Sequence, residues 1–213
     1  MSPALTRRDL LALAGLSVAW QVACGRRAPE GAAANAAQPV STAAVASLPV
    51  LEGGGDFTLT DHDNQPFSLS SLRGKVVLIF FGYTFCPDAC PTTLSKLSSV
   101  ARRLGDAAAK VKTLYISVDP ERDTPAVIKA DLANFRLYAL GLTGTKAAID
   151  TVVGQYGAAY EIVPTPDSAA RYTVSHTTTL YALDTAGRLR IKFRYEATVD
   201  EVVAGIRQIL AVS

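Results

Sequence analysis

Residues 75–91 have the sequence KVVLIFFGYTFCPDACP, an apolar run that passes directly into a pair of cysteines. β-Branched and aromatic side chains without polar alternation are typical of a strand that is covered on both faces. Residues 92–104 then repeat apolar side chains every three or four positions and stop at Gly105, which predicts a helix. A buried strand that leads straight into a helix indicates an α/β fold, with Cys86 and Cys90 at the junction.

The rest of the chain extends this unit into a mixed sheet. Further strands are predicted over residues 57–60 and 111–118, and residues 177–183 and 189–195 are predicted to pair as a late β-hairpin. Further helices are predicted over residues 125–137, 145–156 and 199–210, and residues 141–144 are expected to form a loop. This order predicts an α/β, thioredoxin-like fold, in which a mixed central sheet is flanked by helices.

The first 24 residues are predicted to be an export signal or membrane anchor. Arg7 and Arg8 precede an apolar stretch that is shorter than the ~20 residues of a spanning helix, and the arginine pair resembles a twin-arginine signal. Cys24 stands where a lipoprotein signal would be cleaved, although Gln21 replaces the usual aliphatic residue. We therefore expect lipidation of Cys24, cleavage further along the chain, or an uncleaved anchor.

Composition separates the N-terminal region from one folded domain. Residues 25–48 are rich in Ala, Pro, Gly, Gln and Ser, which is typical of a flexible linker, and residues 49–213 are predicted to be the thioredoxin-like domain. The net charge is +2 and no block of basic residues is longer than a short pair, so no nucleic-acid partner is expected. The predicted location is the periplasmic side of a bacterial inner membrane, with attachment through the N-terminus.

In an exported domain, Cys86 and Cys90 are expected to form a disulfide, a redox pair or a metal site. In helical geometry their Cα atoms would lie roughly 6 Å apart, which suits either a disulfide or shared binding of a metal at ~2.3 Å. Pro91 predicts that the regular helix begins near it, so both cysteines would lie on a loop and first turn. Exposed N–H groups there would lower a thiol pKa. A merely stabilising disulfide is disfavoured, because it would close a very short loop.

His176 is the leading candidate for a third metal ligand. The chain has only two histidines, and His62 lies in a polar turn where we expect it to be exposed. His176 precedes the late hairpin, a position that can face the cysteine loop in a thioredoxin-like fold. Two thiolates and an imidazole suit Cu(I), or Cu(II) with an added oxygen ligand, whereas a structural zinc site usually has four protein ligands. An acidic cluster is expected to cap its loop and not to bind metal: Asp119, Glu121 and Asp123.

Four segments together resemble the Sco/SenC family of copper-binding thioredoxin-like proteins: GKVVLIFFGYTFCPDACP, ISVDPERDTP, GLTGT and YTVSHTTTLYALDTAGR. The resemblance extends from about Leu48 to the C-terminus and implies copper binding by Cys86, Cys90 and His176. It also implies a role in maturing the copper A centre of cytochrome c oxidase, with the subunit that carries this centre as partner and other copper chaperones as further candidates. The chain departs from the family at Ser175, where Asp is common.

The same residues allow more than one activity. A copper chaperone would hold the ion with Cys86, Cys90 and His176 and pass it on by ligand exchange. A thiol–disulfide oxidoreductase would instead use the cysteine pair as catalytic thiols that reduce the cysteines of the copper site. The C-x-x-x-C spacing and the lack of an obvious cis-proline before the late hairpin disfavour a general reductase. A thiol peroxidase or redox sensor is a third alternative.

Overall fold

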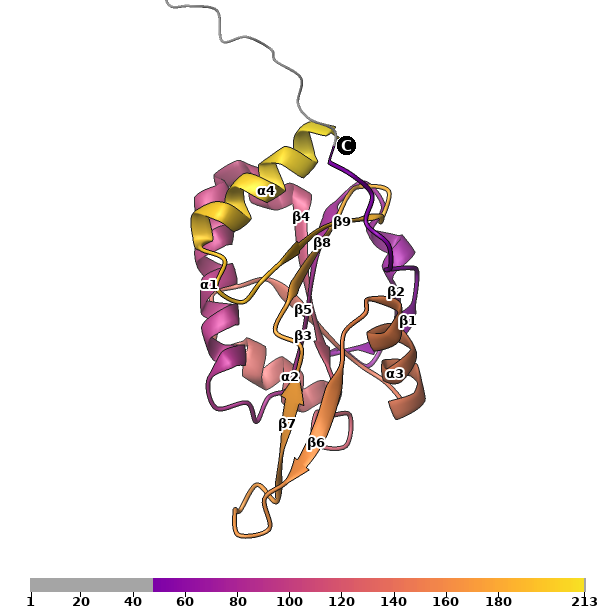
Figure 1. Ribbon diagram of the computed structural model, residues 1–213, viewed down its shortest axis with the longest axis vertical. Helices are drawn as coiled ribbons and strands as arrows, with labels where there is room; N and C mark the ends of the chain where they lie inside the picture. Colours follow the sequence, from indigo (N-terminus) through magenta and orange to yellow (C-terminus); the bar gives the residue numbers. More distant parts are fainter. Residues whose placement is uncertain (1–47, 213) are drawn as a thin grey trace, which may run out of the picture. The chain divides into compact units, whose positions relative to one another are not determined.

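The computed structural model describes residues 48–212 (Figure 1). The predicted export signal, Cys24 and nearly all of the predicted linker lie outside the described residues. In the described part, no helix has both the length and the apolar character needed to cross a membrane.

A seven-stranded sheet forms the centre of this part, in the order β2-β1-β5-β4-β3-β8-β9. Its strands are β1 (Thr58–Asp61), β2 (Pro66–Ser68), β3 (Val76–Gly82), β4 (Val111–Ser117), β5 (Ala139–Thr143), β8 (Leu180–Leu183) and β9 (Leu189–Phe193). A separate two-stranded sheet, the β6–β7 ribbon, consists of β6 (Tyr160–Pro164) and β7 (Tyr172–His176). The helices are α1 (Ala89–Leu104), α2 (Pro125–Leu132), α3 (Lys146–Gln155) and α4 (Val199–Val212), with short 3-10 helices at Leu69–Leu72 and Gly105–Lys110.

The sheet is mixed because helices connect some of its strands and hairpins connect others. Strands β3, β4 and β5 are parallel and are joined by α1 and α2, whereas β8 and β9 are antiparallel to their neighbours. Right-handed connections that step in one direction place α1 and α2 on the same face. Figure 1 shows α1, α2 and α4 on one side of the sheet and α3 on the other. The predicted thioredoxin-like fold, with helices on both faces and a late hairpin, is confirmed.

Strand β3 is the most buried element and determines where the cysteines lie. All seven of its residues are buried, because β4 and β8 pair with its two edges and helices cover both faces. On the covering helix α1, Leu94, Leu97 and Val100 are each 1% exposed. The apolar run that predicted a covered strand therefore delivers the cysteine motif to the carboxyl end of the sheet.

The loop predicted over residues 141–144 is wrong, because residues 141–143 belong to β5. Residues 139–142 pair with β4. Position 141 of this strand requires glycine, because a Cβ there would clash with the Ile128 side chain of α2. Helix α2 correspondingly ends at Leu132, earlier than residue 137. Gly141 therefore indicates close packing of a helix on the strand, not a loop.

Two further differences concern the elements that carry the candidate ligands. Helix α1 begins at Ala89, two positions before Pro91, because proline is tolerated in a first turn whose N–H groups have no helical partner. The β6–β7 ribbon was not predicted, since much of β6 is exposed and shows no alternating apolar pattern. Consequently His176 ends β7, and the hairpin strand begins later, at Leu180.

Candidate metal centre

Cys86 and Cys90 lie at the turn between β3 and α1. The N–H of Cys86 donates to the Tyr83 carbonyl at 3.2 Å, which closes the turn after the strand. Cys90, the second residue of α1, is 3% exposed, and Cys86 is half-buried. Both are free thiols in this structure. One sulfur is therefore enclosed by the core and the other is open toward solvent.

His176 joins the two cysteines from the end of β7. Its Nε2 lies 3.4 Å from the Cys90 Sγ, and the N–H of Cys90 donates to the Cys86 Sγ at 3.4 Å. One ligand atom from each of the three residues lies within 4.8 Å of the other two. Two ligands that share a zinc- or copper-sized ion at ~2.0–2.3 Å are at most ~4.6 Å apart. A small side-chain movement would thus place all three on one ion.

The His176 ring is held in the orientation that a metal ligand requires. Its Nδ1 lies 3.1 Å from the Thr177 carbonyl, which can only accept, so Nδ1 carries the proton and Nε2 keeps its lone pair. The ring packs edge-on against Phe80 and Tyr83, with centroids 6.1 and 5.8 Å apart. Nε2 therefore faces the thiols as a ligand. A donor set of two sulfurs and one imidazole fits a soft ion such as Cu(I) and also accepts zinc.

The two thiols share one proton unequally. A hydrogen bond from the Cys90 thiol lowers the pKa of Cys86 to about 3 against the opposing effect of burial, helped by the backbone N–H groups of Asp88 and Cys90. The same hydrogen bond, together with burial, raises the pKa of Cys90. The predicted contribution of the helix N-terminus is thus present but smaller than that of the partner thiol. A metal ion that binds both sulfurs must displace the Cys90 proton.

Gly82 allows the approach of α1 to the sheet at this point. A Cβ at Gly82 would lie 2.9 Å from the Cys90 Sγ, 2.9 Å from the Tyr115 ring and 3.0 Å from the Phe80 ring. Contacts this short do not occur for real Cβ atoms, so any other residue would push Cys90 out of place. The glycine that ends the strand is therefore part of the site, a role that its turn-like sequence context did not reveal.

One residue of the acidic cluster, Asp123, is hydrogen-bonded to the cysteine loop. Asp123 is fully buried, and its carboxylate accepts from the Thr84 N–H at 3.0 Å and from the Thr84 and Ser117 hydroxyls at 2.6 Å each. Asp119 is also buried and accepts from Arg122 and from the Tyr172 hydroxyl. Neither belongs to the three-residue group that could hold an ion, and no other such group occurs within residues 48–212.

A solvent-open hollow of about 380 Å³ reaches His176. It is lined by both strands of the ribbon and by the residues that flank them: Ala159, Tyr160, Glu161, Ser175, His176 and Thr177. Ser175 pairs directly with Glu161 across the two strands. The Glu161 carboxylate therefore lies on the strand next to Ser175.

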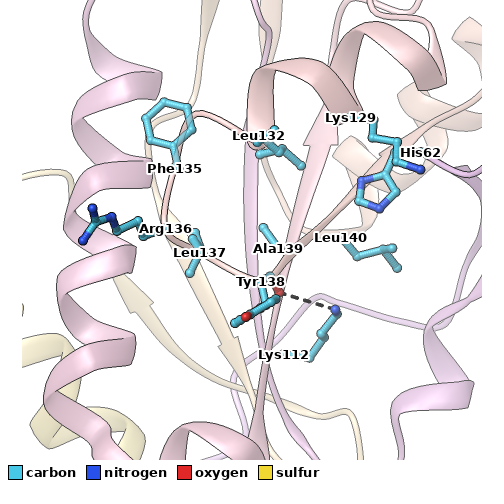
Figure 2. A pocket seen from close by; sticks show the side chains of 11 residues that line it. His62, Lys112, Lys129, Leu132, Phe135, Arg136, Leu137, Tyr138, Ala139 and Leu140 are labelled. Carbon is cyan, nitrogen blue, oxygen red and sulfur yellow. Dashed lines mark hydrogen bonds between the residues drawn. The ribbon is translucent and has the colours of Figure 1, made fainter.

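A larger hollow lies elsewhere and contains none of the three candidate ligands. It has a volume of about 670 Å³ and is lined by basic and apolar side chains near β5, as Figure 2 shows, including Lys112, which donates to the Tyr138 carbonyl at 3.4 Å. His62 lines it and is half-buried, not exposed as predicted, because its Nδ1 accepts from the Gly141 N–H at 3.2 Å. His62 therefore accepts a hydrogen bond from β5 and does not belong to the group formed by the two thiols and His176.

Comparison with known proteins identifies relatives along most of the chain. A family model described as SCO1/SenC matches residues 47–211. The chain is 33% identical over 150 residues to a SCO2-like protein of Rickettsia felis, covering 70% of this chain and 73% of that one.

Solved structures agree with this match. ScoI of Bradyrhizobium japonicum, solved with copper bound, is 44% identical, with a TM-score of 0.67 and coverage of 73% of this chain and 98% of that one. BsSco, described as having a disulfide switch and as a member of the Sco family of cytochrome c oxidase assembly proteins, is 25% identical, with a TM-score of 0.62 and coverage of 78% and 97%.

Proposed function

Because this chain belongs to the SCO1/SenC family, we propose that it binds copper through the sulfurs of Cys86 and Cys90 and Nε2 of His176. The observation that carries the proposal is the convergence of these three ligand atoms within 4.8 Å of one another. The donor types are those that Cu(I) prefers. A relative with 44% identity, ScoI of Bradyrhizobium japonicum, has been solved with copper bound.

The function proposed for this site is delivery of copper to the copper A centre of cytochrome c oxidase. A relative, BsSco, is described as belonging to a family of oxidase assembly proteins. The unequal exposure of the ligands suits transfer: Cys86 and His176 are half-buried and can be exchanged for a partner's ligands, while Cys90 is enclosed and would release the ion last. The oxidase subunit that carries the copper A centre is the proposed recipient.

A reductase activity is the second candidate, and the low pKa of Cys86 favours it. The Cys86 thiolate would attack a disulfide in the partner, forming a mixed disulfide and releasing one partner thiolate, which takes up a proton. Cys90, on losing its proton, would attack the Cys86 sulfur and release the second partner thiolate. Two electrons pass to the partner and leave a Cys86–Cys90 disulfide, which a dithiol reductant must reduce before the next cycle.

Attachment to the periplasmic side of the inner membrane is also proposed, on the strength of the signal-like N-terminus. The arginine pair, the apolar stretch and Cys24 support it. Mass spectrometry of the mature N-terminus tests this directly, because a diacylated Cys24, a cleaved chain and an intact anchor have different masses. An intact N-terminus on a protein recovered entirely from the cytosol would contradict it.

Copper loading of the purified protein tests the ligand set. The wild-type protein should bind one copper ion per chain, and His176→Ala should lower the Cu(I) affinity measured by chelator competition and remove nitrogen coupling from the Cu(II) electron paramagnetic resonance spectrum. His62→Ala is the matched control and should change neither property, because His62 lies against β5. An unchanged affinity and spectrum in His176→Ala would exclude the three-ligand site.

The same variants separate delivery from reduction. His176→Ala removes a metal ligand but leaves both thiols, so it should abolish assembly of the copper A centre if delivery is the function. Assembly that survives His176→Ala but is lost in Cys86→Ser and in Cys90→Ser would identify the reductase activity instead.

A further inference from the structure

Arg122 lies between the two segments that carry the candidate ligands. It belongs to the connection between β4 and α2, and its side chain is only 17% exposed. Its Nε donates to the buried carboxylate of Asp119 at 2.5 Å. None of its atoms belongs to the candidate metal centre, and the copper-binding proposal does not use it.

On one side the Arg122 guanidinium contacts β7, the ribbon strand that ends at His176. Its Nη1 donates to the carbonyls of Ala170 and Tyr172, each at 3.1 Å. The guanidinium also stacks on the Tyr172 ring, 3.6 Å from its centroid, and the Tyr172 hydroxyl donates to Asp119 at 2.8 Å. Tyr172 begins β7, next to the loop that joins the two strands, and His176 ends it, so these contacts fix the far end of the ligand's own strand.

On the other side the same guanidinium contacts the cysteine loop. It lies 4.9 Å from the ring centroid of Phe85, the residue before Cys86, and 5.8 Å from that of Tyr83. The Tyr83 ring in turn packs edge-on against the His176 imidazole. Phe85 remains 55% exposed, so the guanidinium is the buried partner of an otherwise open side chain.

The ribbon needs such an attachment because it is not part of the seven-stranded sheet. Strands β6 and β7 pair only with each other, and Figure 1 shows them projecting beyond the main sheet. A two-stranded ribbon is marginally stable without packing against other elements. The position of His176 relative to the thiols therefore depends on the contacts that attach the ribbon to the rest of the domain.

We propose that Arg122 is a positioning residue that sets the separation between His176 and the two thiols by joining β7 to the cysteine loop. The proposal rests on the three-ligand site described above. Without the guanidinium, the start of β7 is released, and copper is held by Cys86 and Cys90 alone. Lysine cannot replace it, because one ammonium group cannot stack flat on an aromatic ring while donating to a carboxylate and two carbonyls.

Arg190 provides a matched control for the loss of a buried ion pair. Its side chain is 7% exposed, its Nη1 donates to the buried Asp184 at 2.9 Å, and it also donates to the Leu48 carbonyl. It lies on β9, away from the three ligands. Arg190→Met and Arg122→Met thus both remove a buried ion pair and a hydrogen bond to a backbone carbonyl, and only the second removes the aromatic stacking and the link to β7.

The experiment compares Arg122→Met, Arg122→Lys and Arg190→Met in the full chain, with and without copper. In the metal-free protein, the His176 ring signals in two-dimensional nuclear magnetic resonance should shift toward those of an exposed histidine in both Arg122 variants, because packing on Phe80 and Tyr83 is lost. In the Cu(II)-loaded protein, nitrogen coupling should weaken while the thiolate-to-copper absorption persists. The Cu(I) affinity should fall about 10–100-fold, as for other residues that orient a metal ligand. Arg190→Met should change none of these.

Unchanged His176 signals and nitrogen coupling in Arg122→Met would overturn the proposal, and so would equal changes in Arg190→Met, which would indicate general destabilisation. If Arg122→Met does not fold, Arg122→Lys decides, because it retains the charge beside Asp119; wild-type signals in that variant overturn the proposal. Failure of the wild-type protein to bind copper would instead refute the proposed function, and the metal-free signals would still test the role of Arg122.

Discussion

At the scale of single residues, Cys86 and Cys90 have identical chemistry and opposite environments. The Cys86 sulfur is half-buried and accepts hydrogen bonds, whereas the Cys90 sulfur is enclosed against Gly82 and donates. The pair therefore combines one accessible thiolate with one protected thiol. Such an arrangement suits both ligand exchange and disulfide exchange, which explains why the cysteines alone do not distinguish a chaperone from a reductase.

The first prediction concerns the reactivity of Cys86. Because its pKa is lowered to about 3, its thiolate fraction should be constant above about pH 5. In the reduced, metal-free chain, the rate of Cys86 alkylation by iodoacetamide, followed by peptide mass spectrometry, should change less than about twofold between pH 5 and pH 8. An ordinary thiol of pKa ~8.5 changes about tenfold per pH unit over this range.

The control for this prediction is Cys90→Ala, which removes the main donor to the Cys86 sulfur. The pKa of Cys86 should then rise, and the alkylation rate should become pH-dependent. A tenfold slope per pH unit in the wild-type protein would show that the thiols do not share a proton as described.

The second prediction concerns Gly82. In Gly82→Ala the new methyl group would lie 2.9 Å from the Cys90 sulfur, so the free energy of unfolding should fall by ~1–3 kcal/mol and the Cu(I) affinity should also fall. Urea denaturation and chelator competition measure the two effects. Gly154→Ala is the control: nothing lies within 4 Å of its Cβ position in α3, and alanine should be neutral or stabilising by up to ~1 kcal/mol. Wild-type stability in Gly82→Ala would contradict the close approach of α1.

At the scale of elements, the connection between β4 and α2 organises a site to which it contributes no ligand. Asp123 holds the cysteine loop through Thr84, and Arg122 holds the start of β7. The motif DPERDTP therefore supports the segments that carry the candidate ligands without binding the metal itself. The acidic residues were expected to cap their own loop, whereas Asp123 accepts hydrogen bonds from Thr84 of the cysteine loop and Glu121 is exposed.

The third prediction concerns Asp123 in this connection. Asp123→Asn should lower the free energy of unfolding by ~1–3 kcal/mol, because an amide cannot accept all the hydrogen bonds now made to the two carboxylate oxygens. Hydrogen exchange at the Thr84 amide should accelerate, since its acceptor is weakened.

The matched control is Glu121→Gln, which makes the same change of charge in the same connection at an exposed side chain. Its effect on stability should stay within about 0.5 kcal/mol. Equal effects of the two substitutions would show that loss of charge, and not loss of the Thr84 and Ser117 hydrogen bonds, is responsible.

At the scale of the whole molecule, the candidate centre joins segments that are far apart in the sequence. Cys90 and His176 are separated by 86 positions, and they meet only when β3, α1 and the β6–β7 ribbon are all in place. A ligand that binds the folded form alone stabilises it by mass action. Copper binding should therefore be visible as a gain in global stability.

The fourth prediction is the size of this gain. At a free Cu(I) concentration 100 times the dissociation constant, the free energy of unfolding of the reduced protein should rise by ~2.7 kcal/mol, measured by urea denaturation with a Cu(I) buffer. Cys86→Ser should lose most of the gain, and His176→Ala should require a higher Cu(I) concentration to reach it. Equal stabilisation of all three proteins would indicate that copper binds elsewhere on the chain.

The sequence by itself determined the thioredoxin-like fold and the position of the cysteine pair. The covered strand over residues 76–82, the helix after it and the late hairpin each follow from a local pattern of apolar residues. Such patterns can be recognised directly in the sequence. The loop prediction at residues 141–143 was wrong, because the sequence does not distinguish a glycine needed for close packing of a helix from a glycine needed for a turn. His176 was singled out as the leading candidate from residue type and position.

Only the tertiary structure decided how these residues meet. The convergence of His176 with the thiols, the shared proton, the Gly82 contact and the link through Arg122 all join residues that are distant along the chain. The β6–β7 ribbon escaped notice because its exposed strands have no apolar alternation. Such features depend on side chains that packing brings together. The type of a residue alone does not determine which distant residue it contacts in the folded chain.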